Sequence, residues 1–578
     1  MFSRFVSFAY LDRGVRPNPY DFAAFILLLS AFVALAYGSR GLTLPLSAPE
    51  ATAITLDYAA LPYYALRTTL RMFAAMGASL VFTFIYATLA AKSRRAELVL
   101  IPLLDILQSV PILGFLSFTV TFFLQLFPGS MLGAECAAVF AIFTSQAWNM
   151  AFSFYQSLRN LPRDLVEVSN GFHLSPWQKF WQLETPFAMP SLIWNMMMSM
   201  SGGWFFVVAS EAISVGNTTI KLPGIGSYLA QAIEMRRIDA VVAAVATMAI
   251  VILLYDQFLF RPLVVFGGKF RVELSASQTK EHSWVADLFS RTRWLSAIMT
   301  VPVEFLSSLA LLRLEPGFLR PKATDKHEHP SRVLDLLWIS VLALGSLLAL
   351  RYVIAFIGNN LTFDDIRESV ILTSFTMIRV IVLMVLATIV WVPVGVYIGL
   401  RPTLAEKVQP LTQFLAAFPA NVVFPIAVVL IVRYQLNPDI WLSFLIIFGT
   451  QWYILFNVIA GTTAFPNDLK EAARAFGIKG WHWWISVILP GIFPYYVTGA
   501  LTASGGSWNA AIVAEYVKWG DVTIAAHGIG AYISEATVAG DYPRIVLGVG
   551  VMAIFVILFN RLLWRPLFGL AERRLRLD

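Results

Sequence analysis

The sequence is poor in charge and nearly free of cysteine. Lysine, arginine, aspartate and glutamate make up 13% of its 578 residues, against 58% hydrophobic residues, and the mean hydropathy is +0.70. A soluble chain of this length would form several domains, but this composition excludes that class. Cys136 is the only cysteine, which excludes an intrachain disulfide and a metal site built from cysteines.

The common motifs of nucleotide binding and metal catalysis are missing too. There is no G-x-x-x-x-G-K-[ST] sequence, and Gly268-Lys269 lacks the upstream glycine and is followed by Phe270. There is no H-E-x-x-H sequence, and the six histidines show no ligand spacing. We therefore expect no catalytic residue, no metal site and no cofactor in this chain.

Long apolar runs dominate instead. Runs of at least 18 apolar residues recur, and each can cross about 30 Å of hydrocarbon as a helix. Because the backbone finds no water there, such runs indicate a helical bundle. The sequence predicts an all-α integral membrane protein of about twelve transmembrane helices, near residues 22–37, 62–91, 98–126, 132–154, 187–213, 239–261, 333–357, 370–400, 408–432, 440–460, 491–514 and 545–563.

The chain is a tandem duplication. Over about 100 residues the same residue types recur 304 positions later, and further upstream the offset is 308. The matched pairs include Arg71 with Arg379, Pro111 with Pro419, Glu167 with Glu471, Pro186 with Pro490, Trp204 with Trp508, Glu211 with Glu515, Gly224-Ile-Gly226 with Gly528-Ile-Gly530, and Tyr228 with Tyr532. Each repeat has six predicted spans, so the two repeats have the same orientation. We assign residues 1–266 to the first repeat, 267–331 to a linker and 332–578 to the second repeat.

Basic residues set the predicted orientation. The formal net charge is +7, and the basic residues lie beside apolar runs, as in Lys92-Ser-Arg-Arg95 and the tail Arg573-Arg574-Leu-Arg576. This pattern favours a membrane protein with cytoplasmic N- and C-termini over a protein that binds nucleic acid. Residues 1–20 lack the apolar core of a secretory signal peptide, so we expect the first helix to be retained.

The linker contains one further apolar stretch, Trp294–Leu312. A span there would invert the second repeat and move Glu471 to the other side of the membrane. Because the stretch contains Pro302 and Glu304 and has arginines on both sides, we interpret it as an amphipathic helix on the cytoplasmic surface.

A motif lies between the fourth and fifth spans of each repeat. In the second repeat it is Glu471-Ala-Ala-Arg-Ala-Phe-Gly477, followed by Val487-Ile-Leu489-Pro490. It resembles the EAA signature of ABC importer permeases, the cytoplasmic loop that docks on the ATPase subunit. A degenerate copy is Glu167-Val-Ser-Asn-Gly-Phe-His173, ending in Thr185-Pro186. The two loops span residues 466–490 and 162–186, and the alternative is an ordinary alanine-rich surface helix.

Close docking explains these residue types. Ala472 and Ala473 allow close approach, Glu471 offers a charged anchor, and Gly477 permits a sharp turn. In the first copy Glu167 remains and Gly171 stands at the position of Ala475, but Val168 and Ser169 replace the alanines and His173 replaces the glycine. We therefore expect the two loops to dock unequally.

Arg71 and Arg379 each lie early in a long apolar run, in Thr68-x-x-Arg71 and Thr376-x-x-Arg379. An arginine in hydrocarbon is costly, so each should face the bundle interior, a pathway or a partner. As repeat-related residues, both could meet one anion, which makes the four residues candidates for the substrate pathway. The alternatives are that each arginine extends to the interface or pairs with Glu211 or Glu515.

A second candidate segment is Ser201-Gly-Gly-Trp204, which matches Gly505-Gly-Ser507-Trp508 followed by Asn509. Glycines let helices approach closely or break, and interrupted helices often form transport sites. Ser201, Trp204, Ser507, Trp508 and Asn509 are thus pathway candidates, with plain helix packing as the alternative. Pro111 and Pro419 predict kinks that could serve as gate hinges.

Taken together, the chain resembles a fused, duplicated permease of type I ABC importers. An arginine early in the second span before a Val/Leu/Gly run, as in Arg379 to Gly399, resembles the nitrate, sulfonate, taurine and bicarbonate permeases. The resemblance implies a bacterial inner-membrane protein for ATP-driven, alternating-access import of a small anion. It also implies two copies of a separate ATPase, which hold ATP and Mg, a substrate-binding protein outside, and lipid around the chain.

Two alternatives stay open. One is an ABC importer of a solute that is not an anion. The other is an ion-coupled secondary transporter, but such proteins commonly have inverted repeats or membrane-embedded acids. Here the repeats are parallel, and the embedded carboxylates are at most Asp105, Glu135, Glu211 and Glu515.

Overall fold

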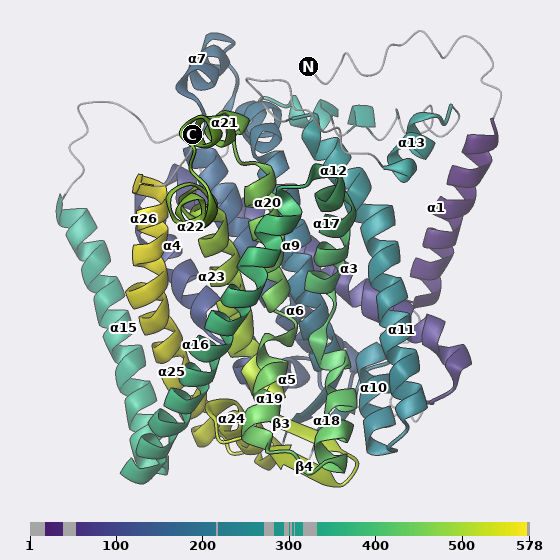
Figure 1. Cartoon of the computed structure of the whole chain (residues 1–578), viewed down its shortest axis with the longest axis vertical. Coiled ribbons are helices and arrows are strands. Elements are labelled where there is room, and N and C mark those ends of the chain that lie inside the picture. The colour runs from purple at the N-terminus through teal and green to yellow at the C-terminus, as the bar shows by residue number, and fades with distance from the viewer. Residues whose placement is uncertain are drawn as a thin grey trace.

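The computed structural model describes residues 18–38, 54–215, 218–270, 283–293, 300, 303–305, 307–315 and 332–574. These residues form a helical bundle with two short β-hairpins (Figure 1). The first half comprises α1 (Pro19–Gly38), η3 (Tyr58–Ala60), α3 (Leu61–Lys92), α4 (Arg94–Ser109), α5 (Ile112–Leu126), α6 (Met131–Arg159), α7 (Arg163–Gly171), α8 (Pro176–Lys179), η4 (Phe180–Glu184), α9 (Thr185–Glu211), β1 (Ala212–Val215), β2 (Thr218–Lys221), α10 (Ile225–Glu234), α11 (Ile238–Tyr255), η5 (Asp256–Phe260) and α12 (Arg261–Gly268).

The second half repeats this order after the linker helix α13 (Trp284–Ser290). It comprises α15 (Arg332–Asn360), α16 (Phe363–Gly399), α17 (Pro402–Ala417), η7 (Ala420–Val422), α18 (Phe424–Arg433), α19 (Pro438–Phe448), α20 (Gln451–Thr463), α21 (Asn467–Ala475), α22 (Gly480–Trp483), η8 (Trp484–Ile488), α23 (Leu489–Ala514), β3 (Tyr516–Trp519), β4 (Val522–Ala525), α24 (Ile529–Ala539), α25 (Tyr542–Phe559), η9 (Asn560–Trp564) and α26 (Arg565–Arg574).

The duplication is also visible in the bounds of individual helices and turns. The helices α7, α8 and α11 begin and end 304 residues before α21, α22 and α25. The π-helical turns η4 and η5 recur at the same offset as η8 and η9. Because a π-turn needs a particular local sequence and packing, its recurrence at both sites confirms that the halves share one fold.

Each half has its own packed centre. In the first half α6 packs against α3 and α9, and in the second α20 packs against α16 and α23. Large buried side chains fill both centres, such as Met72, Met150 and Trp204 in the first and Trp508 in the second.

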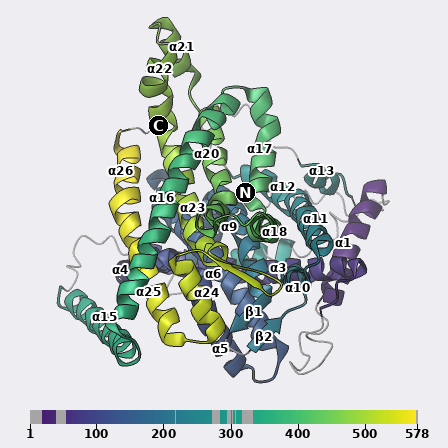
Figure 2. The same cartoon turned by 60° about the horizontal axis from the view of Figure 1, so that its bottom comes forward.

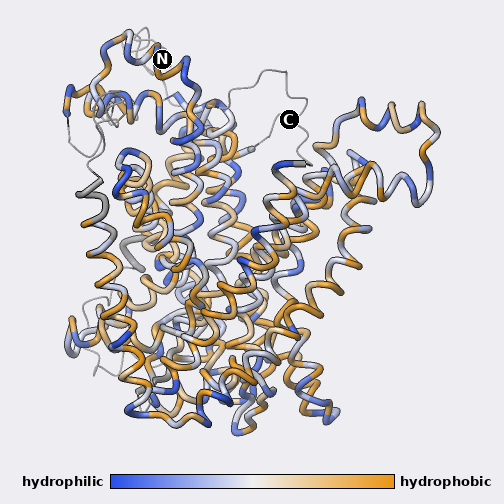
Figure 3. The backbone as a smooth tube through the Cα atoms, turned by 90° about the vertical axis from the view of Figure 1, so that its left-hand side faces the viewer, coloured by the Kyte–Doolittle hydropathy of each residue, from blue (hydrophilic) through white to orange (hydrophobic). Residues whose placement is uncertain are grey.

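The distribution of hydrophobic residues fits a membrane-spanning bundle. Figure 3 shows them along the middle of the helices, with hydrophilic residues toward both ends. Within the described residues, eight helices are long and apolar enough to cross a membrane, or nine if α19 and α20 form one bent span. The predicted twelve are not reached on this criterion, since three predicted spans fail it. In the span 22–37, α1 counts only as a shorter apolar helix (Pro19–Ser30), and the spans 98–126 and 408–432 are each broken.

Both breaks lie at Pro111 and Pro419, the two prolines at which the sequence predicts kinks. α4 ends at Ser109 and α5 begins after Pro111, while α17 ends at Ala417 and η7 begins after Pro419. Pro111 and Pro419 have extended backbone angles and stand where the next helix starts, because proline has no N–H to continue a helix. The kink prediction is therefore confirmed.

The halves differ in their fourth span. α6 is continuous, whereas its counterpart is bent by 40° between α19 and α20, at Gly449-Thr450. A Cβ placed on Gly449 would lie 2.7 Å from the Cβ of Ala420 in η7, so glycine is needed for this close approach. Ser145 occupies the equivalent position in α6.

The bundle has two distinct ends. The end that carries α7 and α21 is called the coupling end below, and the end that carries β1–β4 is called the hairpin end (Figure 1). The hairpins are antiparallel, with Ala212 opposite Lys221 in one and Tyr516 opposite Ala525 in the other. The all-α prediction did not include them, since four-residue strands leave almost no periodic signal.

Described parts of the linker lie against the first half. The backbone N–H of Arg293 donates to Asp21 of α1 at 2.9 Å, and Trp177 of α8 donates to the carbonyl of Leu309 at 2.8 Å. The predicted amphipathic helix 294–312 falls partly on residues 294–299, 301, 302 and 306, which lie outside the described residues.

Candidate functional site

A buried ion-pair network joins four elements at the hairpin end of the first half. Arg71 of α3 donates to Glu135 of α6 through Nε (2.6 Å) and Nη2 (2.8 Å), and to Glu211 of α9 through Nη1 (2.7 Å). The Arg71 and Glu211 side chains are 3% and 0% exposed. Arg67 adds a second cation on Glu135 at 2.5 Å. Two cations thus face two carboxylates, which keeps the buried network neutral.

The same network fixes the start of α10. Thr68 donates to Glu211 at 2.7 Å and accepts the backbone N–H of Ile225 at 3.0 Å. The backbone N–H of Gly226 donates to the other oxygen of Glu211 at 2.7 Å. A Cβ on Gly224 would overlap the Glu211 carboxylate, so the Gly224-Ile-Gly226 segment forms a cradle for this acid.

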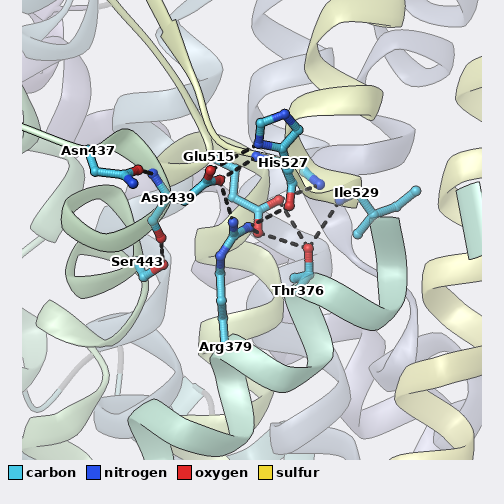
Figure 4. Close-up of polar contacts among 9 residues, drawn as sticks. Thr376, Arg379, Asn437, Asp439, Ser443, Glu515, His527 and Ile529 are labelled. Atoms are coloured by element: carbon cyan, nitrogen blue, oxygen red, sulfur yellow. Dashed lines mark hydrogen bonds and ion pairs between the residues drawn. The ribbon is translucent and has the colours of Figure 1, made fainter. Parts of the chain in front are cut away.

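The second half builds a related network with one acid replaced (Figure 4). Arg379 of α16 donates to Glu515 at 3.0 Å and to Asp439 at 2.7 Å, and Thr376 donates to Glu515 at 2.8 Å. Asp439 is the repeat equivalent of Glu135. The backbone N–H groups of Ile529 and Gly530 donate to Thr376 and Glu515, so α24 is held as α10 is.

This second network is open to solvent on one side. The Asp439 side chain is 38% exposed and the Arg379 side chain 13% exposed. His527, whose side chain is 79% exposed, has its Nδ1 atom 3.0 Å from Asp439, and its carbonyl accepts from Arg379 at 2.9 Å. The first half has Pro223 in place of His527 and adds Arg67 where the second half has Phe375.

The structure therefore brings the predicted residues Arg71, Thr68, Arg379 and Thr376 into acid-paired networks. Pairing with Glu211 and Glu515, which the sequence left open as an alternative, is the arrangement observed. In this conformation both guanidinium groups are bound to carboxylates. A role in the substrate pathway remains a prediction that the structure does not test.

The hairpins cross between the halves. β1 packs against α24, β3 packs against α10, and the backbone N–H of Gly520 donates to the carbonyl of Ile233 at 3.0 Å. Arg236, just beyond α10, forms an ion pair with Asp521 at 2.9 Å. Figure 2, with the hairpin end forward, shows the strands lying across this face. Each half thus covers part of the other.

The proline breaks contact the opposite half. The backbone N–H of Ile112, at the start of α5, donates to Asn509 Oδ1 of α23 at 2.8 Å. Asn421 of η7 donates to the carbonyl of Phe205 of α9 at 3.1 Å. Because Phe205 and Asn509 are repeat equivalents, the two contacts are related, and the breaks and the glycine-rich segments form one interface between the halves.

The other predicted pathway residues line or support this region. Ser201 and Trp204 line a cavity between α9, α11 and α17, with Trp204 only 1% exposed. Ser507 lies 3.0 Å from the Thr450 hydroxyl at the bend of the fourth span. Trp508 is also 1% exposed and packs on Phe559. Their burial fits helix packing, and no contact here tests a role in transport.

At the coupling end, α7 and α21 present matching surfaces. Glu167 and Gly171 of α7 and Glu471 and Ala472 of α21 are exposed, whereas Ala473 is buried. Gly477 has φ +66°, as the predicted sharp turn requires, and His173 takes the same left-handed conformation at φ +49°. Just before these turns, the side chains of Phe172 and Phe476 are 74% and 82% exposed. Sequence reasoning did not select these two phenylalanines, although both stand inside the repeated motif.

The surroundings of the two coupling helices differ. In the first half, Lys92 and Glu184 form a mostly buried ion pair at 2.8 Å. The linker also covers α8, where Trp177 and Gln178 donate to the carbonyls of Leu309 and Leu311. In the second half, Trp481, the equivalent of Trp177, is 75% exposed.

The chain is a multi-pass bundle of two parallel repeats, and in each repeat a protruding helix, α7 or α21, carries the predicted coupling motif. This arrangement is that of a membrane permease of two fused halves. Residues 79–260 and 391–576 match the family of binding-protein-dependent transport system inner membrane components. These two segments cover more than half of the chain, one in each repeat. The chain belongs to this family, and the expected type I ABC permease fold is confirmed.

Individual relatives are more distant. The chain is 32% identical over 176 residues to a bicarbonate transport system permease protein of Synechococcus elongatus, which covers 30% of this chain and 60% of the relative. It is 27% identical over 184 residues to a nitrate import permease protein of Leptolyngbya laminosa, covering 32% of this chain and 62% of the relative. It is 24% identical over 182 residues to a taurine transport system permease protein of Escherichia coli, with the same coverages. The chain thus spans about 60% of the length of these relatives.

Proposed function

We propose that this chain is the transmembrane subunit of an ATP-driven importer that takes up a small anion by alternating access. The observation that carries the proposal is the pair of coupling helices, each ending in an exposed phenylalanine at one end of a duplicated permease. An exposed phenylalanine beside a charged anchor is the kind of group that a partner pocket buries. Two separate ATPase subunits, which hold ATP and Mg, occupy these surfaces in the proposed complex.

The coupling end faces the cytoplasm in this proposal, and the hairpin end faces a substrate-binding protein outside. At the hairpin end the hairpins cross between the halves, whereas each ion-pair network joins elements within one half. Opening the pathway there requires the halves to separate at the hairpins and at the proline breaks. Rigid ion-paired elements on each side support a movement of whole halves.

The anion class is supported by the relatives, which are permeases for bicarbonate, nitrate and taurine. The arginines give no separate support, because both are neutralised by carboxylates in this conformation. The ion-coupled alternative needs an embedded acid free to bind the driving ion. Of the four embedded acids found in the sequence, Glu135, Glu211 and Glu515 are instead paired with arginines, and the side chain of Asp105 lies outside the described part of the structure.

The test is ATP hydrolysis by the complex in lipid nanodiscs, with the binding protein and a panel of nitrate, taurine, bicarbonate and neutral solutes. One anion should stimulate hydrolysis. Phe476→Ala should weaken ATPase association about tenfold or more, since burial of a phenylalanine contributes about 1.5–3 kcal/mol. Glu471→Ala should lower coupled transport, with Phe172→Ala as the matched variant in the other half.

Each outcome bears on a different part of the proposal. Stimulation by a neutral solute would retain the importer but reject the anion. Unchanged ATPase association in Phe476→Ala and unchanged transport in Glu471→Ala would reject the assignment of α21 as the coupling helix.

A further inference from the structure

One side of α23 is polar along the middle of the helix. Thr498, Thr502, Gly505 and Asn509 follow one another at helical spacing, so they share this side. Thr498 and Gly505 are exposed, and Thr502 and Asn509 are partly exposed. The stretch rises about 16 Å, in the centre of a helix that crosses about 30 Å of hydrocarbon. These polar groups therefore lie at membrane depth.

Contact with lipid does not explain this surface. A helix side that faces hydrocarbon should be apolar, because hydroxyl and amide groups without partners are costly there. α16 has such a side: Ile378, Val382, Val385 and Ile389 follow the same spacing, and all four are exposed and aliphatic. The polar side of α23 thus requires water or protein beside it.

The polar side of α23 points to the first half. Asn509 Oδ1 accepts the backbone N–H of Ile112, the first residue of α5, at 2.8 Å. Gln108, near the end of α4, is exposed, and its Nε2 atom lies 3.5 Å from Oδ1 of the exposed Asn149 in α6. A Cβ placed on Gly505 would meet no other part of the described structure within 4 Å, so space remains beside α23.

The repeat-related side of the interface is filled instead. Trp194 of α9 stands at the position of Thr498 and stacks on Phe456 of the opposite half, with ring centroids 5.8 Å apart. The equivalents of the two carboxamides are Tyr453 and Ala416, and both are buried. The interface between the halves therefore has one polar, exposed side and one closed, largely aromatic side.

The polar wall is defined as Gln108, Asn149, Thr498, Thr502, Gly505 and Asn509. None of these residues carries a charge. Their carboxamide N–H and hydroxyl O–H groups can donate hydrogen bonds to the oxygens of an anion. Neutral donors hold an anion weakly enough to release it, as a transport route requires.

Donors of the polar wall are available in this conformation. The amide nitrogen of Asn149 donates to none of the described residues. The Thr498 hydroxyl donates to the carbonyl of Pro494 at 3.0 Å, and it can rotate toward a ligand. A small oxyanion beside α23 would thus meet donors from both halves.

We infer that a small oxyanion crosses the bundle along the polar wall, on one side of the interface, while the side of Trp194 and Phe456 stays closed. The carboxamides of Gln108 and Asn149 and the Thr498 hydroxyl donate to its oxygens. This inference rests on the proposed import of an anion and names the surface that the anion meets.

Access of water to the polar wall is tested with single cysteines in a Cys136→Ser background, since Cys136 is the only cysteine. The probe is 2-sulfonatoethyl methanethiosulfonate, applied to the complex in nanodiscs. Gln108→Cys and Thr498→Cys should react about tenfold faster than two controls, because the reactive thiolate forms in water and not in hydrocarbon. The controls are Ala416→Cys, the repeat equivalent of Gln108, and the lipid-facing Ile378→Cys.

Equal rates for Gln108→Cys and Ala416→Cys would overturn a route on one side of the interface. Equal rates for Thr498→Cys and Ile378→Cys would show that the polar side of α23 lies in lipid, which would also overturn the inference.

Contact with cargo is tested by import into proteoliposomes that contain the ATPase and the binding protein, with nitrate, taurine and bicarbonate as probes. Asn149→Leu and Thr498→Val should each lower anion import per ATP hydrolysed about fivefold, as expected for the loss of one hydrogen bond. Thr247→Val is the matched control, because Thr247 of α11 also donates to the carbonyl four residues before it and lies outside the polar wall. Thermal unfolding shows whether each variant is folded, and Asn149→Ala replaces an unfolded Asn149→Leu.

These outcomes separate the inference from the proposed function. Unchanged import by folded Asn149→Leu and Thr498→Val, in a complex whose wild type imports an anion, would overturn the inference alone. A wild type that imports none of the three anions would reject the proposed anion importer, and the route for an oxyanion would fall with it.

Discussion

The two halves share a fold, but at both ends of the bundle the first half is held together by more deeply buried contacts than the second half. At the hairpin end, the network around Arg71 is buried on all sides, whereas Asp439 and His527 in the second half face solvent. At the coupling end, the first half adds the Lys92–Glu184 ion pair and the linker over α8. The second half has Leu400 and Ile488 at the positions of Lys92 and Glu184.

This difference shows what fusion of a duplicated permease permits. In a dimer of identical chains, a change in one subunit is copied into the other. In the fused chain, the second half retains the fuller EAA sequence and an exposed α22, while the first half has a degenerate loop partly covered by the linker. The two halves of a fused chain can thus differ in stability and in the surface that each presents at the coupling end.

The largest contrast is expected from the buried acids. Glu211→Gln should lower the free energy of unfolding by about 3–5 kcal/mol, because it breaks a fully buried ion pair. Glu515→Gln should cost less, about 1.5–3 kcal/mol, because Arg379 and its second acid Asp439 are 13% and 38% exposed and water can take part of the lost bonding. Unfolding of both variants in detergent compares the two, and equal losses would contradict the difference between the networks.

The buried pair at the coupling end should behave as a unit. Glu184→Ile alone should destabilise by about 3 kcal/mol, since it leaves Lys92 buried without its acid. The double variant Lys92→Leu/Glu184→Ile copies the second half and should lie within about 1 kcal/mol of wild type. A double-mutant cycle on unfolding free energies measures the coupling, and additive losses would show that the pair contributes no mutual stabilisation.

The smallest effect concerns the turn after each coupling helix. His173→Gly should stabilise the protein by about 0.5–1 kcal/mol, because histidine is strained at φ +49° and glycine is not. Gly477→His should destabilise it by a similar amount. Thermal unfolding of the two exchanges checks the sign, and a stabilising Gly477→His would refute the strain argument.

Much of this fold was predictable because the sequence contains two repeats that predict the same elements. The 304-residue offset predicted elements that begin at equal positions, and Pro111 and Pro419 predicted the two helix breaks. Glu211 and Glu515 were foreseeable partners of the arginines because they recur together. Glu135 and Asp439, the second acids bound by Arg71 and Arg379, were not recognised as members of these networks. One is glutamate and the other aspartate, and no short motif marks them.

Other features depend on packing that no local pattern records. The hairpins and π-turns are too short for a periodic signal. The sequence did select candidate pathway residues such as Trp204, because a glycine-rich segment ending in tryptophan recurs in both repeats. Whether such a residue contacts cargo depends on conformations in which the halves have separated.

One contact at the crossed hairpins depends on the sequence differences between the halves. The ion pair between Arg236 and Asp521 joins one residue from each half. Two first halves would supply Arg236 but an asparagine in place of Asp521, and two second halves would supply Asp521 but a glycine in place of Arg236. Only unlike halves can therefore make this pair. The pair is exposed and contributes little to stability, but it is one contact between the halves that the divergence of the repeats has made specific.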